Sequence, residues 1–284
     1  MLGPDDLVLC AATLSRVPFV ERIEAASAAG FRGISMWSTD YAQAREAGVS
    51  DAELRTRLAD HGLEVAELDP LLNWVPGTGL GAGANQEGMA FFRATEADFY
   101  RMAEAVHARS INVALFTDAP IERAALVEPF AALCDRASQY DLLVHLEFMP
   151  FTQVPNLAAA LEVVSLADRP NGGVTLDTWH HFRGGGTAQT LAGVPGTRLL
   201  AVQISDAPRE PHPDVIEETM RLRRVPGDGD ADLAEVIAAL RASGSSAPLG
   251  AEIFSDALAE LPGKEAAQRA AEGLRAVLER SRSL

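Results

Sequence analysis

The segment GGVTLDTWHHFRGGG, residues 172–186, begins like a buried strand and ends in residues that could do chemistry. Its apolar residues VTL are followed at once by Asp177, and then by His180 and His181. A carboxylate at a strand end can bind a metal ion, and a nearby imidazole can contact a substrate. We therefore expect Asp177 to belong to a functional site, whereas His181 is either a second substrate contact or, as we favour, a surface residue.

Three other strand-like runs have the same arrangement of one apolar face and one face that turns polar near the carboxyl end. Side chains alternate along a strand with period two, so Glu147 shares a face with His145 and opposes Leu146. The last strongly polar residues on these second faces are Glu147 (run 142–148), Asp177 (173–179), Gln203 (199–205) and Glu252 (249–254). We expect these side chains to point inward, with His145 one layer deeper as a hydrogen-bonded core residue.

A cluster of Glu147, Asp177 and Glu252 would need a compensating charge. Carboxylates crowded at one place repel one another and cannot all stay ionised unaided at neutral pH. A divalent cation resolves this, and carboxylate and amide oxygens suit Mg²⁺ or Mn²⁺. A single acid at a strand end is more often a helix cap or a surface ion-pair partner, but the repeated inward parity favours a metal site.

Apolar runs alternate with helical patterns along the whole chain. A strand–helix alternation predicts a parallel sheet, and eight such units predict a single (β/α)₈ TIM barrel over residues 1–284. An open, doubly wound sheet is the structural alternative. The longest irregular stretch, residues 73–88, follows the third strand and would lie on the active-site side of a barrel. The remaining strand-like runs are 7–14, 31–37, 63–69 and 111–116.

Composition restricts the partners and the compartment. The formal net charge is −16, which disfavours nucleic acid and anionic membranes as partners. The N-terminal residues MLGPDDLVLC do not resemble a signal peptide, and no run approaches the length of a membrane span. Cys10 and Cys134 show no paired spacing, so a reduced, cytoplasmic setting is expected.

Five motifs resemble those of the xylose-isomerase-like TIM barrels, the sugar phosphate isomerase/epimerase and AP endonuclease family 2 group. They are HLEFMP (145–150), LDTWHH (176–181), VQISDAPRE (202–210), RVPGDGDADL (224–233) and GAEIFSD (250–256). The resemblance implies Glu147, Asp177, Gln203 and Glu252 as metal ligands. Gln203 stands where this family often has histidine, which favours Mn²⁺ or Mg²⁺, with Co²⁺ and Zn²⁺ as further candidates.

The same resemblance implies substrate contacts. His180 and Arg209 match a substrate-binding histidine and arginine of the epimerase branch, whereas Gln153 replaces a glutamate that those epimerases carry. Trp37 and Trp179 sit at strand ends, where aromatic side chains could wall a pocket for a ring-shaped substrate or simply pack in the core.

The leading functional hypothesis is a metal-dependent isomerase or epimerase of a sugar, keto-sugar or related polyol. Glu147 and Glu252 would exchange the proton through an enediolate, and His180 would donate a hydrogen bond to the developing oxyanion. The alternative is a lyase or dehydratase of the same superfamily acting on a keto-cyclitol or keto-glycoside. A metal-dependent endonuclease and a non-catalytic carbohydrate-binding barrel are weaker alternatives. Family members often form homo-oligomers, so a dimer or tetramer is an expectation.

Overall fold

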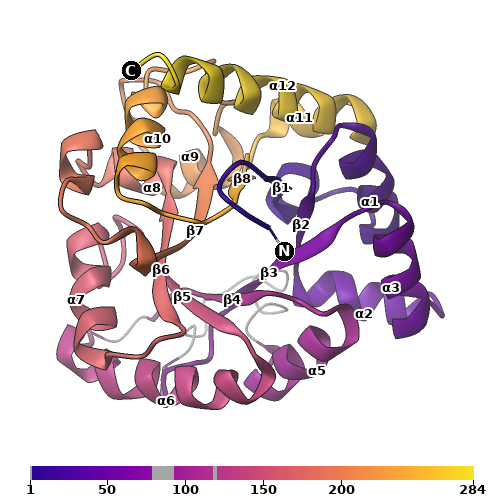
Figure 1. Ribbon diagram of the computed structural model, residues 1–284, viewed down its shortest axis with the longest axis horizontal. Helices are drawn as coiled ribbons and strands as arrows, with labels where there is room; N and C mark the ends of the chain where they lie inside the picture. The colour runs from indigo at the N-terminus through magenta and orange to yellow at the C-terminus, as the bar shows by residue number, and fades with distance from the viewer. Residues whose placement is uncertain (1, 79–92, 118–119) are drawn as a thin grey trace.

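The computed structural model describes residues 2–78, 93–117 and 120–284. Within these ranges, strands β1 to β8 form a closed parallel barrel in chain order, with helices outside it (Figure 1). The fold expected from the strand–helix alternation is therefore confirmed. Most of the irregular stretch 73–88, from residue 79 onward, lies outside the described residues.

Every strand falls within or overlaps one of the runs expected from the sequence. The strands are β1 (Leu7–Leu9), β2 (Gly33–Met36), β3 (Glu64–Leu71), β4 (Ser110–Val113), β5 (Leu143–Glu147), β6 (Gly172–Asp177), β7 (Leu199–Ile204) and β8 (Leu249–Ala251). β1 is much shorter than the run 7–14, because a 3₁₀ helix at Ala11–Leu14 takes over its second half.

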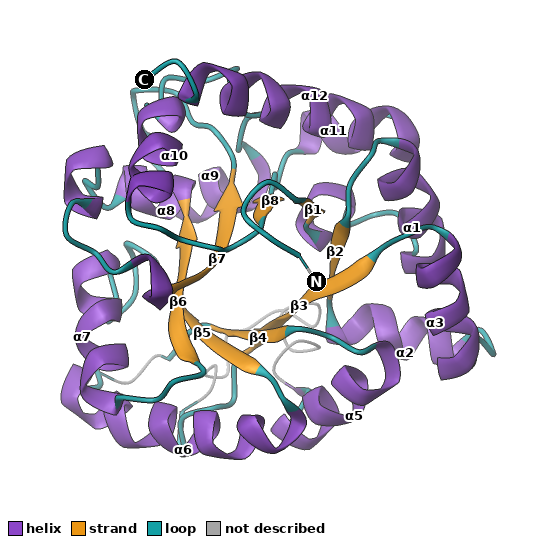
Figure 2. Ribbon diagram, viewed as in Figure 1, coloured by secondary structure: helices purple, strands orange, loops and turns teal. Residues whose placement is uncertain are grey.

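The helices form a ring around the strands, which lie in the centre of the view (Figure 2). They are α1 (Phe19–Ala28), α2 (Ser38–Glu46), α3 (Asp51–Asp60), α5 (Glu96–Val106), α6 (Val127–Ala137), α7 (Leu157–Ala167), α8 (Thr178–Arg183), α9 (Val215–Arg221), α10 (Leu233–Ala242), α11 (Asp256–Ala259) and α12 (Gly263–Ser281). Several begin at side-chain caps, such as Ser50 for α3 and Asn156 for α7, whose oxygens accept backbone N–H groups of the first turn.

The main core lies between the barrel and the helix ring. Val144, Leu146 and Phe148 are fully buried there, as the period-two alternation predicted. Inside the barrel, a small apolar cluster of Leu2, Val8, Cys10 and Ala66 packs together. The N-terminal segment crosses this end of the barrel (Figure 1). One end of the interior is thus apolar, which leaves the carboxyl ends of the strands for polar side chains.

Three register shifts interrupt the strand pairing, between β2 and β3, between β3 and β4, and between β6 and β7. Between β6 and β7 the pairing passes from Val174–Leu199 to Thr175–Ala201, so Leu200 is skipped. By period-two alternation Leu200 would share the helix-facing side of Val202 and Ile204, but its side chain lies against Gly173. Between β2 and β3 the pairing shifts in the same way, and Ala66 is skipped. A skipped residue shifts the following residues to the opposite face of the strand. A period-two pattern counted across a skipped residue therefore predicts the wrong face.

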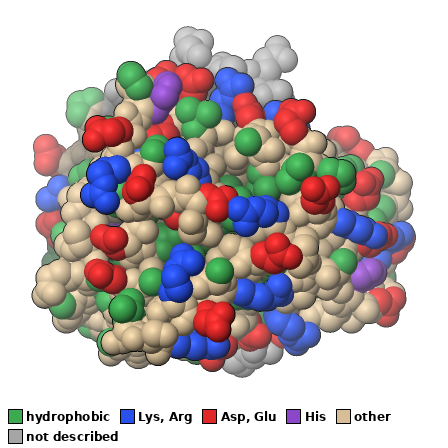
Figure 3. Space-filling model, turned by 90° about the horizontal axis from the view of Figure 1, so that it is seen from above, with side chains coloured by type: hydrophobic (Ala, Val, Ile, Leu, Met, Phe, Trp, Pro, Cys, Tyr) green, Lys and Arg blue, Asp and Glu red, His purple; other side chains and the backbone are tan. Residues whose placement is uncertain are grey.

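Charged side chains of both signs are interspersed on the face that Figure 3 shows. Across the described ranges, no helix combines the length and the apolar character needed to cross a membrane.

Gly173 provides a test of how closely β6 and β7 pack. A Cβ atom added at this position would lie 2.4 Å from Leu200 Cγ and 2.7 Å from the Arg198 carbonyl oxygen. We expect Gly173→Ala to lower the free energy of unfolding by about 1–3 kcal/mol, because overpacking forces neighbouring groups to move. Urea denaturation followed by circular dichroism measures the change. In Gly3→Ala, where the nearest atom lies 3.9 Å away, stability should be almost unchanged. Equal stability of both variants would contradict the packing argument.

Candidate active site

A cavity of about 350 Å³ lies at the carboxyl ends of the strands. Its polar lining consists of Asp69, Glu147, His180, Thr219, Arg223 and Glu252. Its walls are apolar and largely aromatic, and they include Trp37, Leu72, Phe116, Met149, Phe151 and Phe254. The cavity therefore combines a charged group of side chains with walls that suit the faces of a ring.

Asp177 ends β6 and caps the next helix. Its Oδ1 accepts the backbone N–H of His180 at 2.8 Å and so caps α8, which begins at the next residue. Its Oδ2 accepts a hydrogen bond from Arg223 Nη1 at 2.7 Å. Burial alone would raise the pKa of Asp177, but the charge of Arg223 and contacts with His180 lower it to about 2. Asp177 is therefore a carboxylate at neutral pH.

Glu147 ends β5 and lies beside His180. Its Oε1 is 3.3 Å from His180 Nε2, and its Oε2 accepts a hydrogen bond from Asn112 Nδ2 at 2.7 Å. One potential ligand atom each from Glu147, Asp177 and His180 lies within 4.8 Å of the others. The structure thus brings together two of the expected metal ligands and the expected substrate-contacting histidine.

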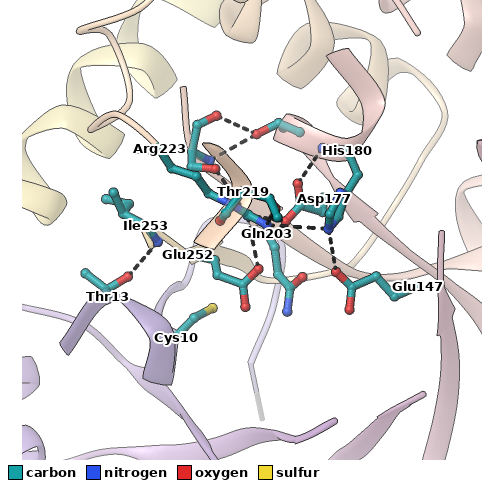
Figure 4. Close-up of polar contacts among 12 residues, drawn as sticks. Cys10, Thr13, Glu147, Asp177, His180, Gln203, Thr219, Arg223, Glu252 and Ile253 are labelled. Atoms are coloured by element: carbon teal, nitrogen blue, oxygen red, sulfur yellow. Dashed lines mark hydrogen bonds and ion pairs between the residues drawn. The ribbon is translucent and has the colours of Figure 1, made fainter. Parts of the chain in front are cut away.

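Gln203 on β7 is paired in register with Asp177 and lies between Glu252 and Glu147 in Figure 4. Its Nε2 donates to Glu67 Oε1 at 3.1 Å, whereas its buried Oε1 has no hydrogen-bond partner. Glu252 directly follows β8, and its Oε2 is 3.4 Å from Arg223 Nη1. Both side chains are buried and inward, as the strand parity predicted.

Arg223 is a site residue that sequence reasoning missed. Its guanidinium ion-pairs with Asp177 and Glu252, and its Nη2 donates to Thr219 Oγ1 at 2.9 Å. Burial would lower the pKa of Arg223, but the surrounding carboxylates more than offset this and raise it. No signal in the segment RLRRVPG distinguishes Arg223 from the neighbouring arginines, because it lies outside any regular strand or helix.

β3 and β4 contribute a second group of polar residues that the sequence analysis did not identify. Glu67 and Asp69 on β3 are buried, and Asn112 Nδ2 donates to both Asp69 Oδ1 and Glu147 Oε2. Burial raises the pKa of Glu67 to about 7 and that of Asp69 well above its usual range. Two acids two residues apart on a central barrel strand are the signal that could have revealed them.

The charges of this region favour a bound cation. Burial first, and then the charge of Asp69, raise the pKa of Glu252 well above its usual value, because its ionised form is both desolvated and repelled there. Gln203, between Glu252 and Glu147 in Figure 4, adds a buried side-chain oxygen that has no hydrogen-bond partner. Carboxylate and amide oxygens are suitable ligands for a hard divalent ion, so the residues present fit one.

The three remaining expected site residues, Trp37, Trp179 and Arg209, differ in whether they line the cavity. Trp37 lines the cavity and stacks on Phe254, with ring centroids 6.3 Å apart. Trp179 and Arg209 are not among the described residues that line it. Trp179 is buried beneath Arg223, whose guanidinium carbon lies 5.3 Å from its ring centroid. Arg209 is exposed, because the chain after β7 turns outward, and its backbone N–H donates to Asp230.

Two further histidines, His181 and His145, are buried near the site. His181 is buried rather than at the surface, with Nε2 3.0 Å from the Thr187 carbonyl oxygen, because α8 turns it inward. His145 is the deep core residue expected, in contact with Thr175 Oγ1 and Ser110 Oγ. Burial lowers the pKa of His145 to about 3, so it is neutral at physiological pH.

Curated relatives include enzymes of two kinds. The chain is 32% identical to a 3-dehydroshikimate dehydratase of Pseudomonas aeruginosa over 91% of its own length. It spans only 39% of the length of that relative. It is also 30% identical to an inosose isomerase of Bacillus subtilis, over 51% of each chain.

Solved structures and a family comparison agree with the fold. A xylose isomerase-like TIM barrel/4-hydroxyphenylpyruvate dioxygenase fusion protein superposes with a TM-score of 0.84 at 25% identity, over 99% of this chain and 44% of that one. The zinc-bound IolI protein superposes with a TM-score of 0.85 at 21% identity, over 98% of this chain and 100% of that one. The family described as "Xylose isomerase-like TIM barrel" matches residues 23–277. With this match across most of its length, the chain belongs to the xylose isomerase-like TIM barrel family.

Proposed function

We propose that this chain is a divalent-metal-dependent dehydratase that eliminates water from a ring-shaped hydroxy-ketone such as a keto-cyclitol. The observation that carries the proposal is the set of buried carboxylates and the unpartnered Gln203 oxygen beside a cavity with aromatic walls. The acids suit a metal ion and proton transfer, and the walls suit the faces of a ring.

The proposed metal ligands are Glu147, Asp177, Gln203 and Glu252, with Mn²⁺ or Mg²⁺ as the preferred ion. Their carboxylate and amide oxygens support this choice, and a ring nitrogen of His180 also lies within 4.8 Å of a carboxylate oxygen of Glu147 and of Asp177. A divalent ion bound there would polarise the substrate carbonyl and acidify the neighbouring C–H bond.

The chain's own residues would move the proton. Glu147 and Glu252 come from β5 and the end of β8, so they approach a substrate from different sides. One carboxylate accepts the proton from the carbon next to the carbonyl, the carbon–oxygen bond of the β-hydroxyl then breaks, and the carboxyl group gives its proton to the departing hydroxide, which leaves as water. His180 donates a hydrogen bond to the oxygen on which negative charge develops. Each carboxylate has two oxygens, so metal binding and proton transfer by the same residue are compatible.

The relatives support elimination over isomerisation. The similarity to 3-dehydroshikimate dehydratases extends over 91% of this chain, whereas the similarity to the inosose isomerase covers 51%. Trp37, Phe116, Phe151 and Phe254 give the cavity flat apolar surfaces that can pack on both faces of a ring. A small-molecule substrate, and not a macromolecule, fits a cavity of about 350 Å³.

Isomerisation or epimerisation is the second candidate. In Figure 4, Glu147 and Glu252 lie on either side of Gln203, an arrangement that suits proton removal on one side and return on the other. The first chemical step is the same in both reactions, so deuterium exchange tests both and product analysis separates them.

Metal binding should stabilise the protein. We expect Mn²⁺ at about 100 times its dissociation constant to raise the free energy of unfolding by about 2.7 kcal/mol, and a chelator to reverse the effect. Thermal denaturation with and without Mn²⁺ measures the shift. Asp177→Asn should lose most of it, whereas Glu104→Gln, on the exposed side of α5, should keep it. No Mn²⁺-dependent shift in the wild-type protein would contradict the proposed metal site.

Proton transfer should depend on both glutamates. With 3-dehydroshikimate or an inosose and Mn²⁺ in heavy water, we expect Glu147→Gln and Glu252→Gln each to slow deuterium uptake or water loss by about 10²–10⁴-fold. Mass spectrometry follows the exchange, and ultraviolet absorbance follows the conjugated product of elimination. Mn²⁺ affinity is measured in parallel to separate lost ligation from lost proton transfer. Full turnover by Glu147→Gln would exclude its acid/base role.

A further inference from the structure

Gln203 can bind a cation with only one end of its side-chain amide, whereas a carboxylate can bind with either oxygen. Its side-chain amide has an oxygen that can bind a cation and an NH₂ group that cannot, and the two ends are nearly equal in size. A rotation of the amide by half a turn would place the NH₂ group where the cation binds. A metal site that uses glutamine therefore needs a neighbour that holds the amide in one orientation.

Glu67 lies where it can hold the Gln203 amide in one orientation. Its Oε1 lies 3.1 Å from Gln203 Nε2, across the barrel interior from β3 to β7. An ionised carboxylate only accepts hydrogen bonds, so the reversed amide would set two acceptor oxygens against each other. In the observed orientation Gln203 Oε1 is buried and has no partner, which leaves its lone pairs available to a cation.

Glu67 is itself held from other strands. Cys10 Sγ, just after β1, is 3.8 Å from Oε1, and His145 Nε2 on β5 is 3.7 Å from Oε2. The register shift that skips Ala66 brings Glu67 into pairing with Ser35. Glu67 is 4% exposed and is not among the described residues that line the cavity, so it is not placed to touch a substrate.

We propose that Glu67 is a positioning residue that holds the Gln203 amide with its oxygen toward the bound cation. This inference rests on the proposed metal-dependent function. Glu67 acts through Gln203 and takes no part in proton transfer. Removing such an outer partner of a metal ligand weakens metal affinity by about 10–100-fold.

The test is a titration of the substrate-free protein with Mn²⁺ at pH 8, with free Mn²⁺ measured by electron paramagnetic resonance. Glu67→Met removes the acceptor at similar volume and should weaken Mn²⁺ binding by about 10–100-fold. Glu67→Gln keeps the side-chain volume but can both donate and accept, so it can pair with Gln203 in either orientation and should also weaken Mn²⁺ binding. If Glu67→Met does not fold, Glu67→Ala takes its place with the same criteria.

A double-mutant cycle separates positioning from simple charge attraction. In a Gln203→Ala background, Glu67→Met should cause little further loss, because the amide it would orient is gone. A similar loss in both backgrounds would show that only the charge matters and overturn the proposal. Unchanged affinity in Glu67→Met would overturn the positioning role alone. A wild-type protein that binds no Mn²⁺ would overturn the proposed function as well.

Discussion

The structure of this site depends on the repulsion between carboxylates that the barrel buries at one end. Asp177 and Glu252 share the guanidinium of Arg223, which lowers the pKa of Asp177 to about 2 but leaves that of Glu252 raised. One buried arginine therefore cannot satisfy all the acids around it. Folding these groups together is costly unless positive charge is supplied, and this requirement links the stability of the barrel mouth to the binding of a cation.

A neutral polar layer below the acids gives them their orientation. His145 contacts Thr175 and Ser110, and Asn112 accepts a hydrogen bond from Thr175 while donating to Glu147. Burial keeps His145 uncharged, so this layer adds hydrogen bonds without adding charge. The site is thus built on strands with few free rotamers, which suits chemistry that requires fixed distances.

The walls and the polar groups of the cavity have separate origins in the fold. Glu147 and Glu252 come from strand ends, whereas the apolar Met220 lies on α9 and Phe254 follows β8 on the way to α11. In this barrel architecture the strands carry the shared chemistry and the connecting segments shape the substrate space. Curated relatives that include dehydratases and isomerases are consistent with this division.

The sequence alone determined the barrel and the inward direction of Glu147, Asp177, Gln203 and Glu252, because period-two alternation is a local property of strands. Their roles as ligands remain proposals. Only the tertiary structure revealed Arg223, which reaches the acids from an irregular segment distant from them along the chain. Register shifts, which depend on the partner strand, moved Leu200 off its expected face and set the pairing of Glu67. Local patterns determine which face a strand presents, and long-range packing decides which side chains meet there.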